Sequence, residues 1–439
     1  MADRVTNRWL VVAGGILVQL CLGAIYAWSA FTGKLTDPQG PFRFTRSETQ
    51  AVFSVGLITF TTVMALFAGR WQARVGPRLV AMAGGVLLGA GYVLASRWSD
   101  FRGVLLGIGL LGGAGIGLAY VCPIAALVKW FPDRKGFISG LAVAGFGFGA
   151  LVWVKLTSGF RFGPVDLTPG WHGLFGAPPA GPGWSVEQVF LLYGVLFASI
   201  VGLGALALLD PPPGWVPPGW VPPPPTLAAS TGGVEYRALE MVRTSQFWRI
   251  FVAFFFSATA GLMVIGVIGL FGTEALVRSG TSGPRAAVMT ATAMGLFFAL
   301  SNALGRVTWG WISERTGRRA GIVVMCLLQG TMMILFPRLA GSEAGLYAAA
   351  AAVGFNFGGN YALFPAITAD FFGNRSLGTN YPWVFMAGGV AGVAGPLLGG
   401  HMGDRQAWGW AFGPSGLACF LGAALVLALR PPRRTRPPA

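Results

Sequence analysis

The chain has 439 residues, of which 54% are hydrophobic and only 10% are Asp, Glu, Lys or Arg. Since about a quarter of the residues in soluble proteins are charged, this composition excludes an ordinary soluble chain and indicates an integral membrane protein. The formal net charge of +16 does not indicate a nucleic-acid partner, because the basic residues flank apolar runs and form no single patch. The two histidines and four separated cysteines show no metal-ligand spacing, so we expect neither a metal nor another cofactor.

Long apolar runs follow one another along the chain, and a run of about 20 such residues crosses a bilayer. Six runs precede a proline-rich segment and six follow it: 9–31, 49–69, 79–96, 103–130, 136–156 and 186–209, then 247–272, 287–312, 320–336, 344–371, 381–402 and 411–429. The sequence therefore predicts an all-α polytopic membrane protein with twelve transmembrane helices in two pseudo-symmetric six-helix bundles.

The segment between the two sets of runs has a different composition. It begins P-P-P-G-W-V-P-P-G-W-V-P-P-P-P, which no helix tolerates and which favours an extended spacer. The next stretch, E-Y-R-A-L-E-M-V-R, suggests a short interfacial helix. We divide the chain into an N-terminal bundle (1–209), a cytoplasmic linker with that short helix (210–245), a C-terminal bundle (246–430) and a basic tail (431–439).

The loop charges predict the orientation of the chain. With a cytoplasmic N-terminus, the cytoplasmic loops hold 19 Lys and Arg and the opposite loops hold 11, among them Lys155. We therefore expect both termini to be cytoplasmic, in a monomer that lies in the plasma membrane, the inner membrane of a bacterium. The remaining basic residue, Arg306, falls well inside the eighth run, and we expect it to be the single charge within the membrane.

Arg306 is the strongest functional candidate. An arginine in a membrane span costs at least ~2.5–3.5 kcal/mol on insertion scales, so it is usually functional. Its guanidinium is suited to binding a carboxylate through two parallel hydrogen bonds. Asn302 lies four residues earlier on the same helical face and can orient Arg306. The alternatives are that Arg306 binds helix-end carbonyls and braces the bundle, and that Asn302 makes an ordinary interhelical hydrogen bond.

Two features repeat at a nearly constant offset. The sequence G-R-W-Q-A-R-V-G-P-R at 69–78 is matched by G-W-I-S-E-R-T-G-R-R at 310–319, 241 residues later. A Pro and a Gly after the fourth run, at 123 and 136, recur after the tenth run at 365 and 378, 242 residues later. Two landmarks at one offset indicate duplicated halves.

These two loops resemble the loop signature of the major facilitator superfamily. The resemblance implies that they act as conformational-switch loops, through Gly69, Arg70, Arg74, Gly76 and Arg78 in the first and Gly310, Glu314, Arg315, Gly317 and Arg318 in the second. In that family a carboxylate in this loop caps a neighbouring helix. Glu314 matches the carboxylate, whereas the first loop has Ala73 at that position.

Further segments narrow the resemblance. The stretches Q-L-C-L-G-A-I-Y-A-W-S-A-F, P-P-G-W-V-P-P-G-W, R-T-S-Q-F-W, N-A-L-G-R and G-G-N-Y-A-L-F-P-A-I-T-A-D-F-F-G resemble the oxalate/formate antiporter family, which is related to the monocarboxylate transporters. This implies a carrier of small carboxylates, and not an enzyme. Oxalate exchangers of that family pair the arginine with a lysine in the eleventh span, where this chain has Gly388. One cation favours one carboxylate over two.

The resemblance also implies which spans line the cavity. Their candidate contacts for a short acid are Leu22, Tyr26, Tyr120, Phe357, Tyr361 and Phe385, each of which has packing as its alternative role. We therefore predict a secondary transporter of monocarboxylates such as lactate, formate or acetate, working by alternating access as proton symport or anion exchange. The alternatives are an oxalate:formate antiporter, and a membrane sensor or receptor that keeps a transporter fold without moving solute.

Overall fold

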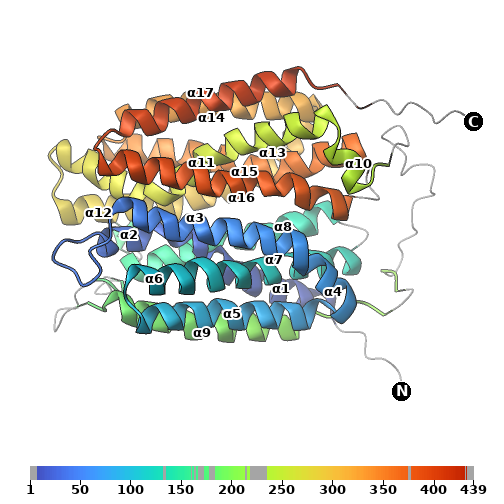
Figure 1. Cartoon of the computed structure of the whole chain (residues 1–439), viewed down its shortest axis with the longest axis horizontal. Helices are drawn as coiled ribbons and strands as arrows, with labels where there is room; N and C mark the ends of the chain where they lie inside the picture. Colours follow the sequence, from blue (N-terminus) through green and yellow to red (C-terminus); the bar gives the residue numbers. More distant parts are fainter. Residues whose placement is uncertain are drawn as a thin grey trace, which may run out of the picture.

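The helices run roughly along one long axis of the molecule (Figure 1). The computed structural model describes residues 7–131, 135–159, 161–162, 165–166, 173–176, 183–212, 215–217, 235–373, 377–430 and 432. Most of the proline-rich linker and all of the basic tail except residue 432 lie outside the described residues. The domain boundaries drawn from the sequence therefore stay predictions.

The first half contains α1 (Arg8–Leu22), the 3-10 segment η1 (Gly23–Ala27), α2 (Ser29–Leu35), α3 (Arg46–Val63), the π-helical η2 (Met64–Ala68), α4 (Gly69–Val75), α5 (Pro77–Arg97), α6 (Phe101–Val104), the π-helical η3 (Leu105–Gly112), α7 (Gly113–Trp130), α8 (Lys135–Ser158), a two-stranded antiparallel hairpin of β1 (Arg161–Phe162) and β2 (Val165–Asp166), and α9 (Val186–Leu206). The second half contains α10 (Ala238–Val242), α11 (Ser245–Arg278), α12 (Gly283–Thr292), the π-helical η4 (Ala293–Phe298), α13 (Ala299–Thr316), α14 (Arg318–Leu339), α15 (Glu343–Phe372), α16 (Leu377–Asp404) and α17 (Trp408–Leu427). The short helix α10 lies where the sequence suggests an interfacial helix.

Eleven helices of the described chain are long and apolar enough to cross a membrane. The tenth predicted span corresponds to α15, which is 30 residues long and lies among the others (Figure 1) but is not in that group. Its buried Asn356 and Asn360 lower its hydropathy, so its position in the bundle comes from packing against neighbouring helices.

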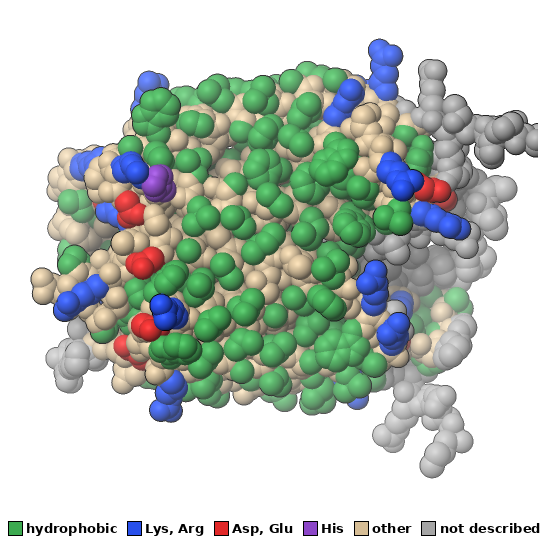
Figure 2. All heavy atoms as spheres, viewed as in Figure 1, with side chains coloured by type: hydrophobic (Ala, Val, Ile, Leu, Met, Phe, Trp, Pro, Cys, Tyr) green, Lys and Arg blue, Asp and Glu red, His purple; other side chains and the backbone are tan. Residues whose placement is uncertain are grey.

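Apolar side chains cover the middle of the molecule, and charged side chains gather at its two ends (Figure 2). This pattern is expected of a surface that faces lipid in its central belt and water at both ends. The chain is a multi-pass membrane protein.

The duplicated loops share a backbone conformation. Gly76, with φ 85°, separates α4 from α5, and Gly317, with φ 88°, separates α13 from α14. Such a positive φ favours glycine. Arg78 and Arg319, two residues after these glycines, each donate to a carbonyl in the last turn of another helix, α9 and α17 respectively. The repeat seen in the sequence is therefore a repeat of structure.

The two halves are joined away from the linker. We call the end that holds α10 and the end of α17 the linker end, and the opposite end, at the left of Figure 1, the far end. At the far end Asp404 of α16 accepts hydrogen bonds from the backbone N–H groups of Arg46 (3.0 Å) and Ser47 (3.2 Å), and Arg46 also pairs with Glu274 of α11. Further polar contacts between the halves lie at the far end or at mid-depth. The far end is therefore closed.

Candidate functional site

Arg306 lies in α13, where the two halves meet. Its Nε donates to Oδ1 of Asn302 at 3.1 Å, and its Cζ lies 4.6 Å from the centre of the Tyr361 ring. Arg306 is 6% exposed and Asn302 is 1% exposed. Nη1 of Arg306 and Nδ2 of Asn302 have no hydrogen-bond partner among the described residues. Because unsatisfied buried donors are costly, this pair is suited to an anionic acceptor.

The predicted aromatic residues lie together on the side of this guanidinium that Tyr361 covers. The hydroxyls of Tyr26 and Tyr361, one from each half, lie 3.2 Å apart. The Phe357 ring centre lies 5.8 Å from that of Tyr26, and the Phe385 ring centre lies 5.9 Å from that of Tyr361 and 6.1 Å from that of Tyr120. The Tyr120 side chain also lies beside the guanidinium. Five of the six lining residues proposed from the sequence therefore form one cluster, which meets the arginine through Tyr361 and Tyr120.

The sixth lining residue, Leu22, and the position of the missing lysine, Gly388, are also buried. Leu22 is fully buried in the hydrophobic core, four residues before Tyr26. Gly388 is buried in α16, and a side chain at this position would first meet Cζ of Phe254 at 3.8 Å, an ordinary van der Waals distance. The site thus has space, and no second cation, at Gly388.

Three phenylalanines that the sequence did not single out complete the cluster: Phe60, Phe146 and Phe254. The Phe146 ring centre lies 5.1 Å from that of Tyr26, and the Phe60 ring centre lies 5.1 Å from that of Tyr120. Phe146 sits in α8, whose apolar residues are spread around the helix, so no amphipathic pattern marks the face that points inward. An aromatic spacing of one turn would have been a weak signal at best.

The expectation of a single charge within the membrane is wrong. Lys155, placed in a loop by the sequence reading, lies in the candidate span Leu141–Ser158 and is 1% exposed. Its Nζ donates to Oγ1 of Thr292 in the other half at 2.9 Å. Lys155 is the second-last residue of the apolar run 136–156 and was counted with the loop that follows, whereas packing of the two halves buries it.

The switch loops lie at the linker end. Arg318 donates to Oγ of Ser313 at 2.5 Å and lies 3.7 Å from Asp370. The Glu314 side chain is 68% exposed and lies 4.0 Å from Arg318, so the described contacts of Glu314 are with this arginine and not with a helix N-terminus. The switch role of both loops stays a prediction.

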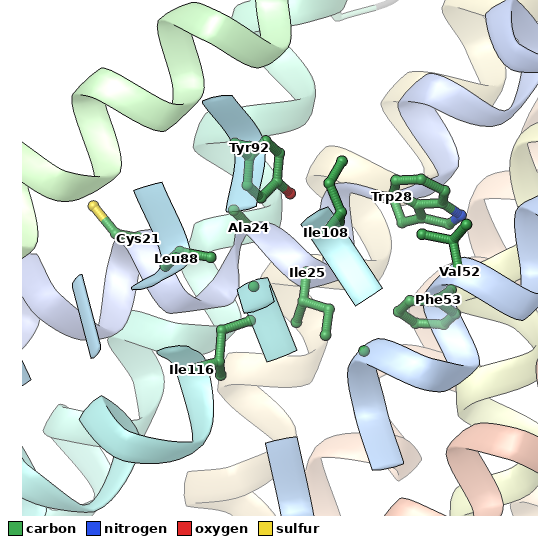
Figure 3. A pocket seen from close by; sticks show the side chains of 12 residues that line it. Cys21, Ala24, Ile25, Trp28, Val52, Phe53, Leu88, Tyr92, Ile108 and Ile116 are labelled. Carbon is green, nitrogen blue, oxygen red and sulfur yellow. The ribbon is translucent and has the colours of Figure 1, made fainter. Parts of the chain in front are cut away.

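A small cavity of about 20 Å³ lies inside the first half (Figure 3). Its walls are mostly apolar, with Ile25, Val52, Phe53, Leu88 and Ile108 among them, and it has room for about one water molecule. It borders the π-helical segment η3 and none of the predicted site residues lines it. We interpret it as a packing gap and not as the solute site.

The sequence of the chain is similar to that of known proteins. Residues 281–439 match the family model of the Major Facilitator Superfamily. The chain has the major facilitator fold. The uncharacterized MFS-type transporter YhjX of Escherichia coli (strain K12) is 29% identical over 394 residues, which cover 88% of this chain and 86% of the relative.

Two further relatives bear on the narrower resemblance. The oxalate:formate antiporter of Oxalobacter formigenes is 26% identical over 433 residues, covering 98% of this chain and 93% of the relative. Monocarboxylate transporter 13 of Bos taurus is 25% identical over 341 residues, covering 76% of this chain and 68% of the relative. The resemblance of this chain to both groups is therefore confirmed, at modest identity.

Proposed function

We propose that this protein is a secondary transporter that carries small monocarboxylate anions across the membrane by alternating access, with Arg306 binding the carboxylate. The observation that carries the proposal is the guanidinium itself. It is 6% exposed, sits between the halves and retains an Nη1 donor without a partner in the described chain. Since Nε is held by Asn302, the free edge of the fork is the one that a carboxylate would engage.

The aromatic cluster supports a short acid. Tyr26 and Tyr361 can turn their hydroxyls from each other to a bound carboxylate, and the phenyl rings of Phe357 and Phe385 can pack its apolar part. A bound anion neutralises Arg306 and lowers the cost of enclosing it between the halves. An empty Arg306 opposes enclosure, so the carrier favours exchange or symport over uncompensated return.

The charge of the site favours one carboxylate. The second candidate function, oxalate:formate exchange, is supported by the relative that matches 98% of this chain. Gly388 argues against it, because a dianion beside one guanidinium keeps one charge unbalanced in a low-dielectric site. The relatives named above are transporters by name, and this supports transport over a sensor or an enzyme.

The test is uptake of labelled formate, lactate, acetate and oxalate into proteoliposomes, with and without a pH gradient. We expect uptake of a monocarboxylate by the unmodified protein and its loss in Arg306→Ala, with partial recovery in Arg306→Lys, which keeps the charge but not the planar fork. Uptake by Arg306→Ala equal to that of the unmodified protein would refute the site. Oxalate exchange without monocarboxylate uptake would establish the second candidate.

A further inference from the structure

Three arginines lie around the last residues of α17, at the linker end of the second half. The guanidinium of Arg249, near the start of α11, donates to the carbonyl of Ala428 at 2.9 Å. That of Arg319, near the start of α14, donates to the carbonyl of Leu427 at 2.6 Å. Arg430 follows two residues after Ala428 and is exposed. We call Arg249, Arg319 and Arg430 the arginine cluster.

The end of α17 sets the spacing of these cations. Leu427 and Ala428 are neighbours in sequence, and neighbouring Cα atoms lie about 3.8 Å apart. Since one N–H group of each guanidinium reaches a carbonyl of this pair, the guanidiniums of Arg249 and Arg319 are within about 10 Å of each other. A guanidinium has five N–H donors, so each arginine keeps further donors for another partner.

The charge of the arginine cluster is not balanced by the described protein. In the part of the chain that the structure describes, no acidic side chain forms an ion pair with any of its members. The carboxylates of Glu314 and Asp370, near the start of α14, face Arg318 instead, at 4.0 and 3.7 Å. Like charges at this spacing repel each other, so an anion from outside the chain would stabilise the cluster.

The arginine cluster lies where the apolar belt meets the linker end. Figure 2 shows Lys and Arg side chains around the end of α17, at the edge of the hydrophobic surface. Leu421 and Leu427 of α17 are 58% and 62% exposed, and Trp248, which precedes Arg249, is 52% exposed. Exposed leucines on a transmembrane helix face acyl chains, and tryptophan is typical of the headgroup level. The guanidiniums are therefore at the depth of lipid headgroups.

We propose that the arginine cluster binds the headgroup of an anionic phospholipid in the leaflet at the linker end. The planar guanidiniums of Arg249 and Arg319 are suited to hydrogen-bond phosphate oxygens, and Arg430 adds charge. The acyl chains extend along the exposed leucines of α17. A phosphate shared by these arginines joins the ends of three helices, because Arg249 belongs to α11, Arg319 to α14, and both are bound to α17. The proposal does not depend on the transported solute.

The test compares phosphatidylglycerol, which is anionic, with phosphatidylcholine, which has no net charge. Native mass spectrometry of the purified protein gives an apparent Kd for each lipid. We expect the Kd for phosphatidylglycerol to be lower about tenfold or more. Replacing Arg249→Gln and Arg319→Gln together removes two charges and keeps amide donors. This variant should bind phosphatidylglycerol about tenfold or more weakly and phosphatidylcholine within about twofold of the unmodified protein. Arg249→Lys with Arg319→Lys keeps the charge without the planar fork, so its Kd should fall between the two.

The matched control removes the same charge at the far end. Arg102 in α6 and Arg338 in the last turn of α14 are both exposed there. Arg102→Gln with Arg338→Gln should leave the Kd for phosphatidylglycerol within about twofold. An equal rise of this Kd in the control and in the glutamine variant of the cluster would overturn the proposal, since only net charge would then matter.

The rival role of Arg249 and Arg319 is solely to cap the last carbonyls of α17. Capping alone predicts the same Kd for both lipids in the unmodified protein, or an unchanged Kd for phosphatidylglycerol in the glutamine variant, and either result would overturn the proposal. Displacement of phosphatidylglycerol by millimolar inorganic phosphate would also overturn it, because the site would then be one for free phosphate.

A further measurement needs no variant that must fold. The unmodified protein is placed in nanodiscs of phosphatidylcholine with and without phosphatidylglycerol, and its thermal unfolding is followed at low and high salt. We expect phosphatidylglycerol to raise the unfolding temperature, and high salt to reduce this gain because it screens exposed charges. The same unfolding temperature in both lipid compositions at low salt would overturn the proposal.

Discussion

Gly388→Lys should convert a site for one carboxylate into a site for two. A Cβ at this position would meet the nearest heavy atom, Cζ of Phe254, at 3.8 Å, so the backbone admits a side chain there. The ammonium would then supply a second cation in the central cluster, on the helix that also carries Phe385. A hydrogen bond to a charged group contributes about 1.5–3 kcal/mol, which corresponds to about a tenfold to hundredfold decrease in the KM for oxalate.

The same substitution should destabilise the empty carrier. Two like charges about 8 Å apart at an effective dielectric constant of about 20 repel by about 2 kcal/mol, and we expect repulsion of this order between Arg306 and the ammonium that Gly388→Lys introduces. We therefore expect thermal unfolding of the purified variant at a lower temperature than the unmodified protein, and recovery on addition of oxalate. Formate, with one charge, should restore less.

The assay is exchange of labelled oxalate and formate in proteoliposomes, and the matched control is Gly388→Met, which adds a side chain of similar length without charge. We expect the ratio of the KM for formate to the KM for oxalate to rise in Gly388→Lys and to stay near the unmodified value in Gly388→Met. An unchanged ratio in the folded lysine variant, or the same change in both variants, would refute the charge argument.

Three further predictions concern other parts of the molecule. Tyr361→Phe keeps the ring against Arg306 but removes a hydroxyl donor to the carboxylate, worth about 1.5–3 kcal/mol, and should raise the KM for formate about tenfold or more. Tyr361→Leu also removes a cation–π contact of about 1–2 kcal/mol and should raise the KM several-fold further, so equal values for the two variants would contradict the cation–π contribution. Asp404→Ala removes the acceptor that holds the start of α3 at the far end. In this variant an impermeant thiol reagent should label Ser54→Cys several-fold faster, and an unchanged labelling rate would show that other contacts close this end. Gly317→Ala places a side chain at φ 88° and should destabilise the protein by about 1 kcal/mol in thermal unfolding. The control is Gly310→Ala, a helical position with open surroundings, where we expect a smaller loss of stability.

The sequence was sufficient for the membrane class, the order of the spans and the duplicated halves, because each depends on properties local to the chain. A run of apolar residues is long enough to cross a bilayer whatever its neighbours are. Gly76 and Gly317 occupy matching loops because both loops need the same positive φ. Arg306 was identifiable for a similar reason, since a charge in the middle of a span stands out without any knowledge of packing.

The tertiary structure alone decided which side chains meet across the halves. Tyr26 and Tyr361 are 335 residues apart in sequence, and their contact depends on the rotation and depth of two helices in different bundles. Phe146 lies in a helix without a polar face, so only its neighbours determine that it points to the site. Lys155 is the clearest case, because a position near the end of an apolar run is buried or exposed according to how the other half closes over it.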